Sequence, residues 1–162
     1  RFRRVNSLGE LPVLELDDGS VITESVAICR FFEDVHPKVP LMGASPAEAA
    51  TIEMWNRRME MMILEPVSQV ARHTFELFAD KYEQVAQYAE TQKRLAQERW
   101  RWLEQELADD RLFVAGDQFS IADITGMAAL MIAGFAQQEI PAECGRVKRW
   151  ETALRSRPSW PQ

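Results

Sequence analysis

The sequence predicts an α+β fold, in which a small strand–strand–helix part is followed by an all-helical domain. Two short apolar runs on either side of an Asp18-Gly19 turn are typical of a β-hairpin. Apolar residues at helical spacing follow directly over residues 25–35, and the rest of the chain shows only helical patterns. The boundaries expected from these patterns are 1–37 for the first part, 38–45 for a linker and 46–162 for the helical domain.

The hairpin is expected from strands over residues 12–16 and 20–22. Pro12 opens the first strand, where a missing backbone N–H is tolerated. The helix that follows is expected to end before His36. Because an isolated two-stranded hairpin is only marginally stable in water, we expect further strands of this part to lie N-terminal to Arg1.

Four helices are expected in the second domain. The first begins at Pro46, a favoured first helical residue, with Ser45 as its N-cap. We expect it to run to about Phe78 and to bend or break at Pro66. The other three are expected over about residues 81–108, 121–137 and 143–157.

The composition argues against several classes of protein. The net charge of −6 disfavours a broad surface for nucleic acid or an anionic membrane. The most apolar stretch, residues 121–136, is too short to span a bilayer and contains Asp123. Cys29 and Cys144 lack the spacing of a metal site or of a disulfide framework, which fits a reducing, cytoplasmic environment. We therefore expect no membrane, nucleic-acid or metal partner.

Glu24 and Ser25 form a candidate binding pair at the start of the first helix. Free backbone N–H groups and the helix dipole favour an anion beside Ser25, and its hydroxyl adds another donor. Glu24 places a carboxylate next to that position. Together the two residues suit an α-amino acid, with its carboxylate on Ser25 and its ammonium near Glu24. On this local pattern alone, an ordinary serine N-cap beside a charged residue is the better interpretation.

The Leu11-Pro12 bond enters the first strand. A cis peptide bond there would turn the Leu11 backbone outward, so that its N–H and C=O could pair with an extended peptide-like ligand. A trans proline at the start of an edge strand is the simpler local interpretation, because only about 5–6% of X-Pro bonds are cis.

These two features belong to one ordered set of residues. The set reads Gly9-x-Leu11-Pro12-Val13-Leu14, then Asp18-Gly19, then Glu24-Ser25-x-Ala27-Ile28. It resembles the cytosolic glutathione transferase family, in its bacterial type. The resemblance implies a thioredoxin-like first domain, a cis proline and a glutathione site lined by Leu11, Pro12, Glu24 and Ser25. In that family the residue before the proline pairs by its backbone with the cysteinyl part of glutathione, and the Glu-Ser pair holds the γ-glutamyl end.

A second match lies at FSIADIT, residues 119–125. Ser120 has the place of an N-cap and Asp123 that of N3, which is an acidic version of the capping box. The pattern resembles the capping motif in the helical domain of the same family. Its expected role is in folding and not in catalysis.

The resemblance implies a homodimeric enzyme that conjugates the glutathione thiolate to small hydrophobic electrophiles, a detoxification activity. The family's activating Tyr, Ser or Cys is expected N-terminal to Arg1, so no residue of the printed chain is assigned as catalytic. In the family the first long helix also faces the substrate pocket. Weak candidates for that pocket are Met54, Trp55, Arg58 and Met62, although ordinary core packing is the better explanation of this Met-rich run.

Two alternatives remain open at this stage. One is a glutathione-dependent isomerase or disulfide reductase of the same fold, and the other is a non-catalytic interaction module with this fold. Cys29 is expected to point into the core between the helix and the sheet, where a buried thiol is usually inert.

Overall fold

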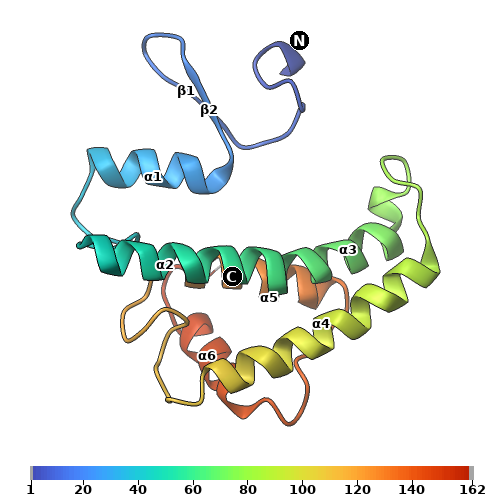
Figure 1. Cartoon of the computed structure of the whole chain (residues 1–162). Coiled ribbons are helices and arrows are strands. Elements are labelled where there is room, and N and C mark those ends of the chain that lie inside the picture. Colours follow the sequence, from blue (N-terminus) through green and yellow to red (C-terminus); the bar gives the residue numbers. More distant parts are fainter. Residues whose placement is uncertain (1, 161–162) are drawn as a thin grey trace.

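A β-hairpin and one helix lie over a bundle of longer helices in the computed structural model, which describes residues 2–160 (Figure 1). The elements follow one another as η1 (Phe2–Arg4), β1 (Val13–Glu15), β2 (Val21–Thr23), α1 (Ser25–Val35), α2 (Pro46–Arg58), η2 (Met59–Leu64), α3 (Glu65–Thr74), η3 (Glu76–Phe78), α4 (Ala86–Glu106), α5 (Ile121–Phe135) and α6 (Gly145–Arg155). Short 3₁₀ turns make up η1 and η3, and η2 is a π-helix.

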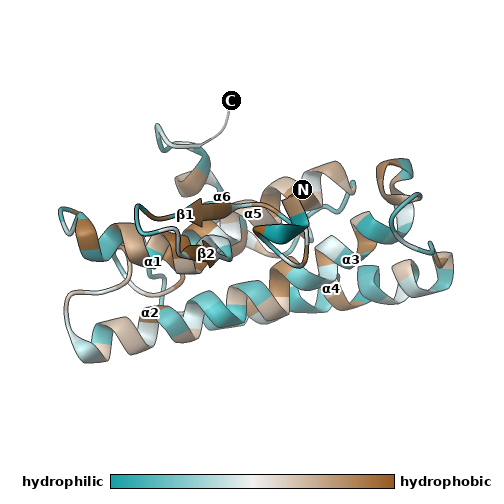
Figure 2. Cartoon of the chain, turned by 90° about the horizontal axis from the view of Figure 1, so that it is seen from above, coloured by the Kyte–Doolittle hydropathy of each residue, from teal (hydrophilic) through white to brown (hydrophobic). Residues whose placement is uncertain are grey.

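The strands β1 and β2 pair in antiparallel register, with Val13 opposite Thr23. The turn between them is closed by Asp18, whose carboxylate accepts hydrogen bonds from the Ser20 backbone N–H at 2.9 Å and the Ser20 hydroxyl at 2.6 Å. Gly19 has a φ of +81°, which glycine adopts without steric cost. The predicted hairpin is therefore confirmed. Figure 2 shows both strands in the brown of apolar residues.

The helix α1 has the predicted bounds, but none of its residues is fully buried. It reaches the bundle through Val26, which packs against the buried Met42, Ile52 and Ile121. On the next turns, the Glu33 carboxylate accepts the backbone N–H groups of Leu41 and Met42, at 2.8 and 2.9 Å. Two backbone groups of the linker are thereby tied to α1.

One long rod of three helical segments follows the linker. The Ser45 side chain caps it by accepting the Glu48 N–H. Near Pro66, where a bend or break is expected, the rod continues without interruption through a π-helical segment, η2. In a regular α-helix the Pro66 ring would clash with the carbonyl four residues earlier. The π-helix avoids this geometry by pairing the Glu65 N–H with the Glu60 carbonyl, five residues back.

The predicted extension of this rod to Phe78 is wrong. The helix ends at Thr74, because Phe75 has an extended backbone with φ −85° and ψ 129°. Residues 76–78 then form the separate turn η3. Likewise α4 begins only at Ala86, five residues after the expected start, and Val85 before it is extended.

The core lies between the rod, α4, α5 and α6. Trp100 and Trp150 are fully buried there, together with Met59 and Ile63 of η2. The helix α5 runs through the centre, and most of its residues are buried. Within residues 2–160, no helix is long and apolar enough to cross a membrane.

Candidate glutathione site

The two halves of the first sequence motif lie at the same edge of the hairpin. Val13 is opposite Thr23 in the last pair of the ladder, so Pro12 and Glu24, the next residue on each strand, lie at the same end of the hairpin. The Leu11-Pro12 peptide bond is cis. Leu11 is 79% exposed, and in the part of the chain that the structure describes its backbone N–H and C=O make no hydrogen bond. An unpaired peptide group is therefore exposed at the end of the hairpin from which α1 begins.

Glu24 has an unusual backbone conformation, with φ +69° and ψ 122°. A residue with a side chain pays on the order of 1–3 kcal/mol for such a conformation, and such residues cluster at binding and active sites. The conformation turns the chain sharply from β2 into α1, so Glu24 and Ser25 form the corner between the strand and the helix.

The start of α1 is open. Glu24, not Ser25, is the N-cap residue, and it makes no side-chain capping bond. The first hydrogen bond across this turn runs from the Ile28 N–H to the Glu24 carbonyl. The preceding N–H groups thus have no intrahelical acceptor. Among the described residues the Ser25 hydroxyl has no hydrogen-bond partner either, so this corner offers several donors to an anion.

Cys29 is exposed, and the expectation that it points into the core is wrong. It lies one helical turn after Ser25, on the same face of α1. Both residues line a cavity of about 170 Å³ together with Glu60 and Leu64 of the rod and Ala128 of α5. Val26 lines the same cavity, so this side of α1 faces the helical domain and not the hairpin.

A larger cavity of about 530 Å³ continues in the same direction. Its lining residues are Ser68, Ala71, Arg72, Phe75, Leu77, Phe78, Tyr82, Ile132 and Phe135. On the rod, Leu64 lines the first cavity and Ser68 the second, four residues later. On α5 the same spacing separates Ala128 from Ile132. Residues four apart share a helix face, so the two cavities follow each other along one groove between the rod and α5.

Two of the proposed substrate-pocket residues lie elsewhere. Trp55 is buried and stacks on Trp102 of α4, with ring centroids 6.1 Å apart. The Arg58 guanidinium lies 4.9 Å from the Trp55 ring and 3.4 Å from the Glu106 carboxylate. Both side chains therefore face α4 and not α1.

The other two pocket candidates do not line the groove either. Met54 is exposed, Met62 is partly buried, and neither lines the two cavities beside α1 and α5. The interpretation of the sequence did not identify the groove residues Ser68, Arg72 and Phe135. A search for side chains four residues apart after Glu60 would have found the first two.

Ser120 and Asp123 form a capping box at the start of α5. The buried Asp123 carboxylate accepts the Ser120 N–H at 3.0 Å and the Ser120 hydroxyl at 3.1 Å. It also accepts the Val114 N–H at 3.0 Å and the Trp150 indole N–H at 2.9 Å. Burial raises the pKa of Asp123, and these four donors oppose the rise.

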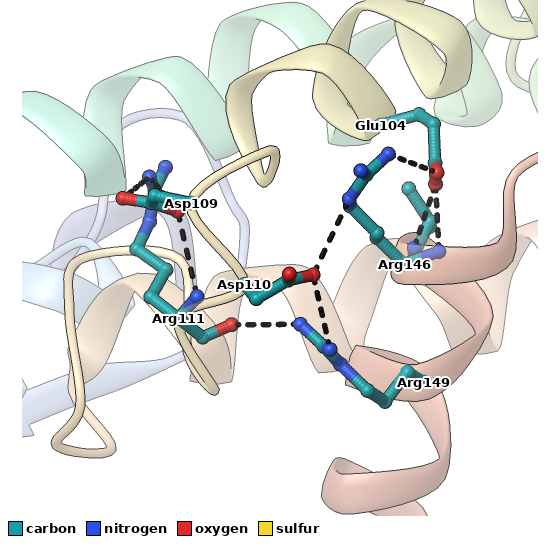
Figure 3. A network of polar contacts seen from close by, with 7 residues as sticks. Glu104, Asp109, Asp110, Arg111, Arg146 and Arg149 are labelled. Atoms are coloured by element: carbon teal, nitrogen blue, oxygen red, sulfur yellow. Dashed lines mark hydrogen bonds and ion pairs between the residues drawn. The ribbon is translucent and has the colours of Figure 1, made fainter.

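A network of ion pairs joins α4, the following loop and α6 (Figure 3). Glu104 accepts the backbone N–H groups of Arg146 and Val147 at 2.8 and 3.0 Å, and so caps α6. Asp110 pairs with Arg149 at 3.2 Å. Its bonds join α4, the loop and α6 to one another, away from α1 (Figure 1).

The comparisons with known proteins cover both parts of the chain. Residues 1–35 match the family model of the glutathione S-transferase N-terminal domain, and residues 59–158 match that of the glutathione S-transferase C-terminal domain. This chain belongs to the glutathione S-transferase family. The hairpin and α1 are accordingly a short thioredoxin-like N-terminal part, and the helices that follow are the all-helical C-terminal domain of that family, so the predicted fold class is confirmed.

Individual relatives show the same likeness along the whole chain. Glutathione S-transferase 2 of Saccharomyces cerevisiae is 34% identical over 160 residues, which are 98% of this chain and 68% of that protein. The crystal structure of a glutathione S-transferase domain-containing protein from Marinobacter aquaeolei VT8 superposes with a TM-score of 0.90 at 36% identity, over 99% of this chain and 78% of that one. For Gtt2 from Saccharomyces cerevisiae the TM-score is 0.88 at 33% identity, over 97% and 76% of the two chains.

The described residues contain no group of three or more His, Cys, Asp or Glu side chains that could hold a metal ion.

Proposed function

We propose that this glutathione S-transferase family member binds glutathione at the corner between the hairpin and α1 and serves its conjugation to small hydrophobic electrophiles. The observation that carries the proposal is the juxtaposition of the unpaired Leu11 backbone with Glu24 and the open helix start at Ser25. A peptide-like ligand needs a strand edge to pair with and a donor group for its carboxylate, and this corner offers both.

Each part of glutathione would have its own partner. The cysteinyl peptide unit pairs with the N–H and C=O of Leu11, in the manner of an added strand, and Pro12 keeps that edge free of a competing N–H. The γ-glutamyl carboxylate accepts hydrogen bonds from the Ser25 hydroxyl and the free N–H groups of α1. The γ-glutamyl ammonium lies near the Glu24 carboxylate, where a charge-assisted hydrogen bond forms.

The conjugation step requires a thiolate. The thiol of free glutathione has a pKa of roughly 8.5, so a hydrogen bond from a hydroxyl or thiol that favours the thiolate increases the nucleophile at neutral pH. None of the described residues is assigned this activating role. The thiolate forms a bond to an electrophilic carbon, and the leaving group departs with its electron pair. Glu24 and Ser25 position glutathione and transfer no proton.

The groove between the rod and α5 supplies a place for the electrophile. It begins at Ser25 and continues into the cavity of about 530 Å³, whose walls include Phe75, Phe78 and Phe135. An apolar molecule bound there would lie along the same groove as glutathione. This assignment replaces Met54, Trp55, Arg58 and Met62 as the proposed pocket, because those side chains do not line the groove.

The proposal includes a homodimer and a cytoplasmic location. Met54 and Met61 are exposed on the rod, which supports a subunit contact on that face. Cys29 and Cys144 are both free, which fits a reducing environment.

Glutathione titration by calorimetry tests the proposal. Ser25→Ala removes one donor to a carboxylate and should weaken binding about tenfold or more, since such bonds contribute about 1.5–3 kcal/mol. Ser156→Ala, an exposed serine at the end of α6, is the matched control and should bind as the wild type does. Wild-type affinity in the Ser25→Ala variant, or no binding by the wild-type chain, would refute the site.

A turnover assay separates the transferase from its alternatives. The protein is mixed with glutathione and chlorodinitrobenzene, and the absorbance of the thioether product is followed. Thioether formation above the uncatalysed rate supports conjugation. Reduction of a glutathione mixed disulfide without thioether formation supports the reductase alternative, isomerisation of a cis-alkene diacid supports the isomerase, and glutathione binding without any turnover supports a non-catalytic module.

A further inference from the structure

The large cavity of the groove has a single cationic group in an otherwise uncharged wall. Of the nine described residues that line it, Arg72 alone carries a charge, and most of the others are apolar. The aromatic and aliphatic side chains around the Arg72 guanidinium exclude part of its hydration, and the cavity wall offers it no competing carboxylate. It is therefore a strong partner for an anion that also brings apolar surface.

Arg72 is weakly engaged by its own protein. The nearest carboxylate oxygen, Glu65 Oε1, lies 3.7 Å from Arg72 Nη1, beyond a good hydrogen bond. That same oxygen already accepts the Gln69 amide at 2.6 Å. The guanidinium also lies 5.8 Å from the centre of the Tyr82 ring. In the part of the chain that the structure describes, the Arg72 side chain donates no hydrogen bond, so apart from the long ion pair of Nη1 with Glu65 its N–H donors are open to a ligand.

Hydrogen bonds hold in place the loop 75–85, which supplies four residues to the cavity wall. The Gln84 amide donates to the Arg72 carbonyl at 3.0 Å and to the Phe75 carbonyl at 2.6 Å. The next residue, Val85, donates its N–H to His73 Nδ1 at 3.1 Å. These bonds hold the C-terminal end of the loop 75–85 against the last turn of α3. The loop residues that line the cavity are thereby held near the guanidinium.

We propose that the large cavity binds apolar molecules that carry a carboxylate or sulfonate, with Arg72 as the residue that selects the anionic group. The volume of about 530 Å³ accommodates one or two aromatic rings. The inference rests on the proposed function in one respect, since it names the class of electrophile that this transferase site would accept. The selection itself is a property of the cavity and does not require glutathione.

A pair of fluorescent probes tests the selection. Anilinonaphthalene sulfonate carries a sulfonate, and phenylnaphthylamine has the same ring systems without it. Each is titrated into the full chain in the absence of glutathione. We expect the wild-type protein to bind the anionic probe on the order of tenfold more tightly than the neutral one. Arg72→Gln should remove this preference and leave the affinity for the neutral probe unchanged.

Two further variants test whether the preference for the anionic probe arises in this cavity. Arg94→Gln, which removes an exposed arginine of α4 outside the cavity, should keep the wild-type preference. Ser68→Trp fills the cavity from the rod and should weaken the binding of both probes. Equal affinities of the wild-type protein for the two probes, a preference that survives in Arg72→Gln, or unweakened binding to Ser68→Trp would each overturn the inference.

The outcome is independent of the glutathione experiment. Ser25→Ala should bind both probes as the wild type does, and Arg72→Gln should bind glutathione as the wild type does. A chain that fails to bind glutathione but prefers the anionic probe through Arg72 would refute the proposed function and leave the selective cavity. A chain that binds glutathione but shows no such preference would refute only the role of Arg72.

Discussion

Asp123 illustrates how a residue recognised from a local pattern acquires partners from distant segments. Its spacing from Ser120 indicates the capping box, which the structure contains. The bonds to Val114 and Trp150 come from the preceding loop and from α6. One carboxylate thus joins three segments of the core, and the cost of burying it is offset by four donors.

The stability of the protein should depend on the ionisation of Asp123. Burial raises its pKa in the folded state above the ordinary value of 3.8. Below that value both states are neutral at this residue. As the pH rises toward about 7, the unfolded chain ionises first, so the folded state loses stability relative to a variant that cannot ionise. Urea unfolding of wild type and Asp123→Asn from about pH 4 to pH 7 should show this relative loss. A constant difference across that range would contradict it.

At the scale of elements, α5 depends on close contact with its neighbours. A Cβ on Gly126 would lie 2.6 Å from the Trp150 ring and 3.1 Å from the Met59 methyl group. Glycine is unfavourable inside a helix by about 1 kcal/mol relative to alanine. Its presence is therefore explained by the space that the buried indole requires. The π-helix η2, which carries Met59, contributes to the same packing.

Two glycine substitutions in α5 should have opposite effects on stability. Gly126→Ala should lower the free energy of unfolding by about 1–3 kcal/mol, because the added methyl group forces Trp150 to move. Gly134→Ala is the matched control, since its Cβ would meet open space, and it should raise stability by up to about 1 kcal/mol. Urea unfolding followed by circular dichroism measures both. Equal effects of the two substitutions would show that helix propensity alone determines them.

At the scale of the whole molecule, the site lies where the N-terminal part meets the helical domain. The smaller cavity is lined by α1 on one side and by η2 and α5 on the other. The contact between the two parts includes the small apolar cluster around Val26 and the bonds from Glu33 to the linker. Few contacts therefore hold the candidate glutathione site over the groove.

Loss of the Glu33 bonds should loosen the linker. Glu33→Ala leaves the N–H groups of Leu41 and Met42 without their acceptor, so residues 36–45 should be cleaved several times faster by a protease at limiting concentration. Asp34→Ala, a change at the exposed neighbouring carboxylate, should leave the cleavage rate unchanged. Equal cleavage rates in the two variants would show that Glu33 does not hold the linker.

The features that could be predicted from the sequence depend on neighbours within a few residues. The Asp18-Gly19 turn, the Ser45 N-cap and the capping box at Ser120 are each formed by hydrogen bonds between residues two or three apart. The sequence therefore predicted the hairpin, the start of the rod and the start of α5. The expected break near Pro66 is not present: the rod is continuous there, and the irregularity takes the form of a π-helical segment.

The sequence by itself determined the elements, the Glu24-Ser25 corner and the family resemblance. Only the tertiary structure decided which helix faces meet. It directed Trp55 toward α4, left Cys29 exposed and brought Arg72 of α3 into one cavity with Phe135 of α5. The physical reason is that local hydrogen bonds and helical spacing specify a helix and its stripes, whereas the partner of each stripe depends on the packing of segments tens of residues apart.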